Sequence, residues 1–133
     1  IKGLNPPENL DIKLMGSIAY RDMPAVYSKS GILVFPTLAD EWGVIVNEAM
    51  AAGIPVLGSL YSQAVEEMVT DRVNGWIFRP DQRSDVYQVL DSALLASPDR
   101  IRRMRIQARE TAMMLTPSKV AKKMSDAIAE ILS

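Results

Sequence analysis

Residues 32–57 read ILVFPTLADEWGVIVNEAMAAGIPVL. The stretch opens with a continuous apolar run at 32–35, which stops at Pro36, and closes with a second apolar run at 55–57. Between the two runs lies an apolar segment that ends at Gly53, a residue type that commonly terminates helices. Continuous rather than alternating apolar runs are typical of parallel strands that helices cover on both faces. The stretch therefore predicts a strand, a helix and a second, parallel strand.

The same alternation continues on both sides of this stretch. Two further strands are expected at 12–15 and 76–78, and Asn74-Gly75 forms a strong turn pair before the second one. The four apolar runs recur about every 20 residues, which is the spacing of strand–helix units. The sequence thus predicts an α/β fold, an open parallel sheet with helices on both faces. Helices are expected at 20–29, 43–52, 62–69 and 83–96.

The C-terminal tail, from about 99 to 132, has a helical pattern without a strand. Thr116 followed by Pro117 marks a helix start inside it, with Thr116 as the cap and Pro117 at the first helical position. An apolar stripe follows at a spacing of four residues, at Val120, Met124, Ile128 and Leu132. This stripe is expected to pack on the domain's own core, and the alternative is that part of it docks onto a partner domain.

The composition excludes several classes of function. The net charge of −1 provides no basic field, so no nucleic-acid partner is expected. The chain has no Cys and no His, which excludes disulfides, thiolate metal sites and the commonest general base, and no metal site is expected. No apolar run reaches the roughly 20 residues of a membrane helix, and no signal-peptide pattern begins the chain. The expected location is therefore the cytoplasm.

Glu48 interrupts the apolar face of the expected helix at 43–52. Its neighbours three and four residues away are Val44, Ile45, Ala51 and Ala52. A helix that is apolar nearly all round is expected to be buried, and a buried carboxylate is costly unless it has hydrogen-bond partners. Two explanations remain open: a nearby backbone group or Lys satisfies Glu48, or Glu48 accepts hydrogen bonds from the hydroxyls of a ligand.

The start of this helix has features of a phosphate site. Helix N-termini present unpaired amides and a partial positive charge, and Gly43 removes the side chain at this point. Asp40 and Glu41 would repel a phosphate beside them, so they suit the uncharged hydroxyls of a sugar. A ligand whose phosphate groups bind to backbone amides and whose hydroxyl groups bind to carboxylates would be a nucleotide-sugar. The alternative is that both acids only stabilise the helix N-terminus.

The segment from Asp40 to Val56 resembles the signature of the retaining glycosyltransferases of group 1. That signature has two acids separated by seven residues, with an aromatic residue and Gly after the first acid, and continues into Glu-Ala-Met-Ala and Gly-x-Pro-Val. The resemblance covers roughly 12–132 and implies the C-terminal, donor-binding half of a GT-B enzyme, which consists of two Rossmann-like domains. It extends to Met15-Gly16, Met23, Val26-Tyr27, Ser30, Pro36-Thr37, Glu67-Met68-Val69, Asp71 and Asn74-Gly75.

The resemblance also implies the roles of individual residues. Glu48 would bind the ribose hydroxyls, and Asp40, the catalytic residue, would sit near the hydroxyls of the transferred sugar. The amides of Gly43 and Val44, next to Trp42, would approach the sugar and the diphosphate. The remaining donor-binding residues implied by the resemblance are Gly16, Ser17 and Ile18 near the base and Thr37 in the same cleft.

The activity implied is the transfer of a sugar, with retention, from a nucleotide-diphosphate sugar without cofactor or metal. Because the chain starts at Ile1 and nothing before Ile12 resembles the family's first strand and helix, we expect a truncated donor domain. An N-terminal acceptor domain would be its partner in the same parent chain, and such a fragment would be inactive alone. Whether the parent associates with a membrane stays open.

Several positions depart from the family's pattern. Asp40 stands where the family usually has Glu, Gln63-Ala64 where it often has Gly-Gly, and Arg72 replaces the Gly of an Asp-Gly turn, a position interpreted as structural. These departures keep an alternative open, a degenerate or non-catalytic Rossmann-like binding module. A signalling receiver is disfavoured because the expected strand ends lack its acidic residues. The family's basic pair for the diphosphate is missing, and poor substitutes are Lys13, Arg21 and Arg79.

Overall fold

The computed structural model describes residues 6–132, which contain a three-stranded parallel sheet in the order β1-β2-β3. The register places Val34 beside Leu57, and Leu57 beside Trp76. Three of the four expected strands are therefore present and parallel, as predicted. Their bounds are Leu33–Phe35 for β1, Val56–Ser59 for β2 and Gly75–Phe78 for β3.

Helices occupy all the positions where the sequence predicts them, with somewhat shorter bounds. The helix expected at 43–52 stops where predicted, because Gly53 has a φ of 72° and its amide donates to the Met50 carbonyl at 2.9 Å. The expected tail is helical throughout except for a break at 114–116. The bounds are Tyr20–Asp22 for the 3-10 turn η1, Met23–Tyr27 for α1, Val44–Ala51 for α2, Gln63–Met68 for α3, Arg83–Leu94 for α4, Pro98–Met113 for α5 and Pro117–Leu132 for α6.

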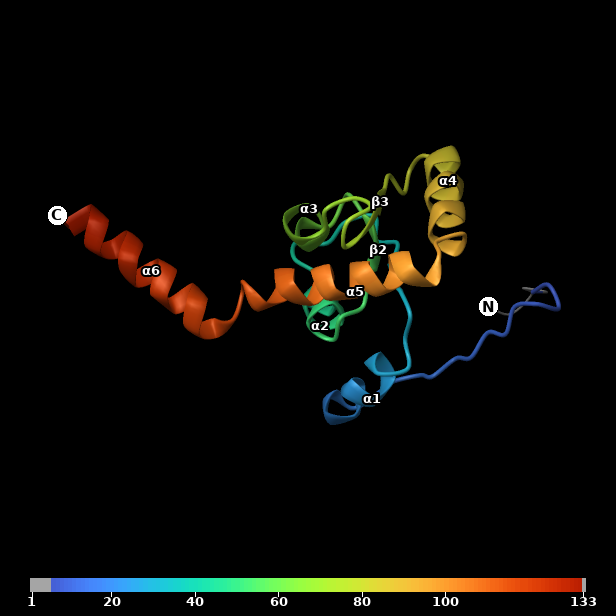
Figure 1. Ribbon diagram of the computed structural model, residues 1–133, viewed down its shortest axis with the longest axis horizontal. Coiled ribbons are helices and arrows are strands. Elements are labelled where there is room, and N and C mark those ends of the chain that lie inside the picture. The colour runs from blue at the N-terminus through green and yellow to red at the C-terminus, as the bar shows by residue number, and fades with distance from the viewer. Residues whose placement is uncertain (1–5, 133) are drawn as a thin grey trace.

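Helices cover both faces of the sheet. Neighbouring residues of a strand point to opposite faces, and Val56 packs in a cluster with side chains of α2 and α3 whereas Leu57 packs with α4. Helix α5 packs against α2 and joins both clusters, because Ala108 belongs to the first cluster and Met104 to the second (Figure 1). The predicted α/β architecture with a two-sided parallel sheet is thus confirmed.

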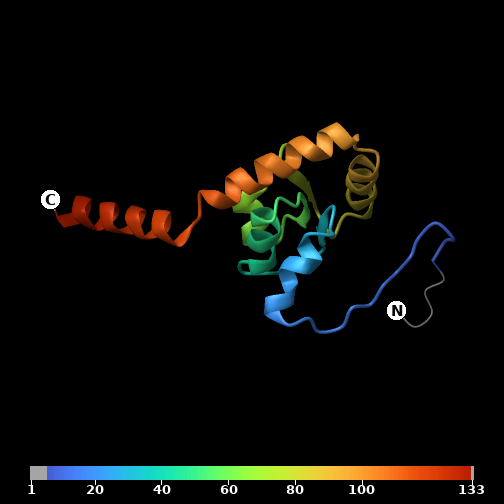
Figure 2. The ribbon, with the colours of Figure 1, turned by 60° about the horizontal axis from the view of Figure 1, so that its bottom comes forward.

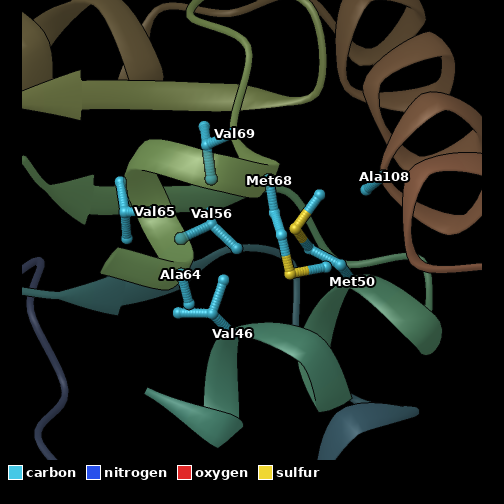
Figure 3. Close-up of a cluster of buried hydrophobic side chains, with 8 residues drawn as sticks. All are labelled: Val46, Met50, Val56, Ala64, Val65, Met68, Val69 and Ala108. Atoms are coloured by element: carbon cyan, nitrogen blue, oxygen red, sulfur yellow. The ribbon is translucent and has the colours of Figure 1, made fainter. Parts of the chain in front are cut away.

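The larger of the two clusters of buried side chains packs α2 against the sheet. Side chains from α2, α3, β2 and α5 converge on one another, and Val46 and Met50 of α2 are fully buried (Figure 3). Burial of each such side chain contributes about 1.5–3 kcal/mol. The cluster consists of Val46, Met50, Val56, Ala64, Val65, Met68, Val69 and Ala108.

The turn before β3 also follows the sequence prediction. The buried Asn74 side chain accepts from the Thr70 amide at 2.7 Å and donates to the Met68 carbonyl at 3.0 Å. Arg72 has a φ of 63°, in the left-handed region that favours glycine. The interpretation of this position as a structural turn is confirmed.

The strand expected at 12–15 is wrong. This segment lies in an extended stretch ahead of η1, away from the sheet, and Leu14 and Met15 are 70% and 54% exposed (Figure 2). A strand needs a neighbour for its backbone N–H and C=O groups, and no described strand pairs with this segment. An apolar run alone therefore did not suffice to form a strand here.

The expectation that the α6 stripe packs on the domain's own core is also wrong. Helix α6 begins at Pro117 as predicted, with the Val120 amide donating to the Thr116 carbonyl at 3.0 Å, but it projects away from the sheet (Figure 1). None of its residues is buried, and Met124 and Ile128 are 61% and 56% exposed. The physical reason is the break at 114–116, which directs the chain away from the core.

Candidate functional site

The loop between β1 and α2 lies at the edge where the parallel strands end. Asp40 forms a parallel bridge with Ser62, and its amide donates to the Tyr61 carbonyl at 3.1 Å. The Asp40 carbonyl in turn accepts from the amide of Gln63 at 3.3 Å. The loop therefore runs alongside the residues that come after β2. This position lies outside the carboxyl ends of the strands, where open α/β sheets bind their ligands.

Asp40 organises this loop with its own side chain. The half-buried carboxylate accepts a hydrogen bond from the Trp42 amide at 3.0 Å. The Trp42 carbonyl accepts from the Ser62 hydroxyl at 3.2 Å and from the Ala64 amide at 2.9 Å. Both ends of the short segment from Asp40 to Trp42 are thereby attached to the start of α3.

Gly43 permits the close approach of the helix start to the sheet. Its φ is 82°, and a Cβ added there would lie 3.0 Å from the Ser62 hydroxyl oxygen and 3.1 Å from the Phe35 ring. Helix α2 begins at the next residue, and the Val46 amide donates to the Gly43 carbonyl at 2.9 Å. The Val44 and Ile45 amides form no hydrogen bond within residues 6–132, as is usual for the first amides of a helix. Val44 is 62% exposed, which places this helix start at the surface. The helix N-terminus predicted from the sequence is confirmed.

The side chains of Trp42 and Thr37 form hydrogen bonds that stabilise the loop between β1 and α2. The Trp42 indole donates to the Asn47 side-chain oxygen at 2.9 Å. The Thr37 hydroxyl donates to the Ala39 carbonyl at 2.9 Å. Each side chain thus stabilises the local backbone, and Trp42 keeps 36% of its surface exposed beside the helix start.

Glu48 has a partner in the protein, the hydroxyl of Tyr27 on α1. The Tyr27 hydroxyl donates to a Glu48 carboxylate oxygen at 2.8 Å, and Glu48 is half-buried. Burial raises the pKa of the Tyr27 phenol to about 12, and the hydrogen bond to Glu48 and its negative charge add to this rise. The phenol is therefore a protonated donor at neutral pH. The partner is neither the backbone group nor the Lys that the sequence suggested.

A pocket of about 440 Å³ lies on the Glu48 side of α2. It combines one carboxylate, one guanidinium and two phenols with an apolar wall, and ligand pockets of this size hold small molecules. Arg21, which the sequence ranked as a poor substitute for the missing basic residues, lines this pocket together with Glu48. The other lining residues are Tyr20, Met23, Pro24, Tyr27, Ser28 and Ala52.

The structure brings together some of the residues predicted for the site and leaves others apart. Glu48 lies one helical turn after Val44, so the two share one side of α2. Gly16, Ser17 and Ile18 precede η1, and among residues 6–132 none of them hydrogen-bonds to the loop or lines the Glu48 pocket. The residues gathered at the carboxyl edge of the sheet are Thr37, Asp40, Trp42, Gly43 and Val44.

Ser62 and Tyr27 contribute to this region through hydrogen bonds that the sequence did not predict. Ser62 directly precedes α3, and the hydroxyl of this fully buried residue donates to the Trp42 carbonyl at 3.2 Å. Tyr27 looks like an apolar position of a short helix, and only its contact with Glu48, 21 residues further along the chain, shows its role. No local signal identifies either contact, because both join segments that are distant in sequence.

The hydrogen-bonding groups of this region are carboxylates, hydroxyls, a guanidinium and backbone amides. Within residues 6–132, no three acidic side chains gather closely enough to hold a metal ion. In the same part of the chain, no helix combines the length and apolar character needed to cross a membrane.

Comparison with known proteins identifies the family to which this chain belongs. The model of the family described as glycosyl transferases group 1 matches residues 7–111, most of the chain. A curated relative, D-inositol 3-phosphate glycosyltransferase of Nocardia farcinica, is 31% identical over 83 residues, which cover 62% of this chain and 18% of that protein. The chain belongs to the group 1 glycosyltransferase family.

Solved structures show the same fold in larger proteins. Sucrose-phosphate synthase from Thermosynechococcus elongatus matches with a TM-score of 0.73 and 23% identity over 89% of this chain and 29% of its own. Anabaena Alr3699/HepE, solved in complex with UDP and glucose, matches with a TM-score of 0.73 and 19% identity over 92% of this chain and 33% of its own. The fold is therefore that of a Rossmann-like domain of GT-B enzymes. The matched part of the chain spans 18% to 24% of the length of its curated relatives.

Proposed function

We propose that the protein containing this chain is a retaining, metal-independent hexosyltransferase that uses a nucleotide-diphosphate sugar, and that this chain forms part of its donor site. Membership of the group 1 family supports a transferase, and the complex of HepE with UDP and glucose supports this class of donor. The acceptor site belongs to a second, N-terminal domain in this proposal. The chain by itself would then be inactive.

The observation that carries the proposal is the arrangement of charge along α2. The helix starts at the surface next to Gly43, where the Val44 and Ile45 amides form no hydrogen bond within residues 6–132, and it carries the half-buried Glu48 one turn later. The rise between Val44 and Glu48 is about 6 Å. A nucleotide-diphosphate sugar requires both features, donors for the diphosphate and a carboxylate for hydroxyl groups.

The proposed chemistry is electrostatic. The bond between the anomeric carbon and the diphosphate oxygen breaks, and the electron pair leaves with the diphosphate. The acceptor hydroxyl forms the new bond on the same face of the sugar and transfers its proton to the departing diphosphate oxygen. Amides of the α2 start stabilise the leaving diphosphate, whereas Asp40 and Glu48 orient the donor.

Tyr27 supports Glu48 in this proposal as a positioning residue. Its hydroxyl occupies one lone pair of the Glu48 carboxylate, and a carboxylate has about four acceptor sites. The remaining sites can accept hydrogen bonds from two neighbouring hydroxyls of a ribose. Gly16, Ser17 and Ile18 stay proposed contacts of the base, and Thr37 a proposed lining residue of the cleft.

Calorimetric titration of UDP-glucose and GDP-mannose into the protein that contains this chain tests the proposal. Glu48→Ala is expected to weaken donor binding by about tenfold or more, because it removes charge-assisted hydrogen bonds. Glu110→Ala is the control, since Glu110 is an exposed acid of α5 outside the Glu48 pocket. An unchanged affinity in Glu48→Ala, or an equal loss in Glu110→Ala, would contradict the role of Glu48.

A second candidate function, a non-catalytic binding module, is favoured by one observation. Both acids of the motif already have partners in the protein, Asp40 the Trp42 amide and Glu48 the Tyr27 hydroxyl. Turnover of a nucleotide-sugar by the native protein and by Asp40→Glu distinguishes the two. Turnover that only Asp40→Glu gains would support a degenerate site, and turnover by the native protein supports the enzyme.

A further inference from the structure

A second pocket, of about 490 Å³, is lined by three arginines. Arg72 and Val73 come from the turn before β3, and Arg100, Arg103, Ile106 and Gln107 come from α5. We call this site the arginine pocket. Its volume lies within the roughly 300–1,000 Å³ of small-molecule sites.

The arginine pocket lies at the opposite edge of the sheet from the proposed donor site. Arg72 precedes β3, whereas Asp40 follows the end of β1, and the strands are parallel. The two sites therefore lie at the amino and carboxyl edges of the same sheet. A ligand in the arginine pocket would not occupy the donor site.

Two of the three arginines of this pocket, Arg100 and Arg103, have no ion-pair partner in the described part of the chain, whereas Arg72 pairs with Asp71. No carboxylate lines it, and the acid beside Arg72 is the exposed Asp71, at 3.4 Å. Arg100 stacks over the Trp76 ring at 5.9 Å, and within residues 6–132 neither Arg100 nor Arg103 forms an ion pair. Convergence of like charges is unfavourable unless an anion neutralises them.

Arg102, the neighbour of Arg103 on α5, provides a comparison for the arginines of the pocket. Arg102 forms a salt bridge with Asp99 on its own helix and does not line the arginine pocket. Arg103 is the next residue, equally exposed, and it lines the pocket without such a bridge. The difference between the two makes Arg102 a matched control for Arg103.

Two further features point to the kind of anion. Arg100 belongs to the first turn of α5, where the helix contributes a partial positive charge. Guanidinium groups bind phosphate through paired hydrogen bonds. The Gln107 amide nitrogen donates one hydrogen to the Glu110 carboxylate at 2.8 Å and has a second one to offer. Val73 and Ile106 are 46% and 58% exposed at the pocket and offer apolar contact to the rest of a ligand.

We propose that the arginine pocket binds a phosphate-bearing ligand at a site separate from the donor site. The phosphate belongs either to a free small molecule or to a lipid headgroup, and both share the chemistry that three guanidiniums recognise. Arg103 and Arg100 provide the main contacts, with Arg72 at the rim. The proposal does not depend on the proposed transferase activity.

Trp76 provides a local signal for binding, because Arg100 stacks on its ring. The chain has two tryptophans, so in a Trp42→Phe background the tryptophan fluorescence comes from Trp76 alone, which Arg100 contacts. Inorganic pyrophosphate is titrated into the full chain as the free-phosphate probe. Vesicles of phosphatidylcholine with and without phosphatidic acid form the headgroup arm.

Arg103→Gln is expected to weaken binding in the responding arm by about tenfold, and Arg102→Gln by less than about twofold. The double variant Arg100→Gln/Arg103→Gln should abolish the response, with thermal unfolding checked because Arg100 contacts Trp76. A response to pyrophosphate assigns a free phosphate compound, and a response only to phosphatidic acid assigns a headgroup. Equal loss in Arg102→Gln and Arg103→Gln, or no response in either arm, would overturn the proposal.

Discussion

Helices α2 and α6 both carry apolar residues at helical spacing, yet they have opposite surroundings. In α2, Val46, Ala49 and Met50 are completely buried against the sheet and its neighbours. In α6 no residue is buried, and Met124 is 61% exposed. The comparison shows that periodicity identifies which face of a helix is apolar, whereas the chain connection decides whether that face meets a partner.

The connections explain the difference. Helix α2 lies between β1 and β2, two adjacent parallel strands, so the crossover holds it on the sheet. Helix α6 follows α5 after the break at 114–116, and no strand follows it within the described residues. Its direction is therefore not restricted by the sheet.

The largest expected effect compares a methionine from each helix. Met50→Ala should lower the free energy of unfolding by about 2–5 kcal/mol, because it leaves a cavity among fully buried side chains. Met124→Ala, the same change on an exposed face, should cost less than about 0.5 kcal/mol. Urea unfolding of the chain followed by circular dichroism measures both. A similar loss in the two variants would show that α6 is packed as firmly as α2.

A smaller effect concerns the polar exception on α2, Glu48 with its partner Tyr27. The pKa of Tyr27 rises from 10.0 in the unfolded chain to about 12 in the folded one, first through burial and then through Glu48. The folded state thus holds its proton more tightly, so the stabilisation is complete below pH 10 and disappears as the pH rises to about 12. The pH-dependent loss should amount to roughly 1–3 kcal/mol.

Ultraviolet absorbance titration of the phenols, with Tyr27→Phe subtracted, isolates Tyr27 from the other tyrosines. Glu48→Ala is expected to lower the pKa of Tyr27, because it removes both the hydrogen bond and the negative charge. A pKa unchanged by Glu48→Ala would mean that burial alone sets it. Glu41→Ala serves as the control for the loss of one acid near α2.

The smallest expected effect lies on the polar face of α6. Lys122 and Asp126 form a salt bridge at 3.1 Å with both side chains well exposed. Lys122→Ala should therefore change the free energy of unfolding by no more than about 0.5 kcal/mol. Helicity measured by circular dichroism should stay nearly constant. A clear loss would mean that local pairs, rather than backbone propensity, maintain this projecting helix.

Much of the fold was predictable because the decisive signals are local. The apolar run at 32–35, the stop at Gly53 and the turn at Asn74-Gly75 all act within a few residues of themselves, and the structure confirms each. The run at 12–15 failed because a strand also requires a neighbour, which is a non-local condition. The α6 stripe failed for the same reason.

The candidate site divides in the same way. The position of Gly43 at the helix start and of Glu48 one turn later follow from spacing alone. The bridge of Asp40 to Ser62 and the presence of Arg21 in the same pocket as Glu48 do not, because each joins segments about 20 residues or more apart. The donor roles of these residues stay predictions that the titrations above address.

The sequence by itself determined the class of fold, the family and the helix that carries the motif, since backbone propensity, apolar periodicity and turn residues act locally. Only the tertiary structure decided which faces are covered and what surrounds each charge. Tyr27 hydrogen-bonds to Glu48, and three arginines line the arginine pocket, because packing brings distant segments together. Burial and charge pairing depend on these distant contacts, and a single segment of sequence does not contain them.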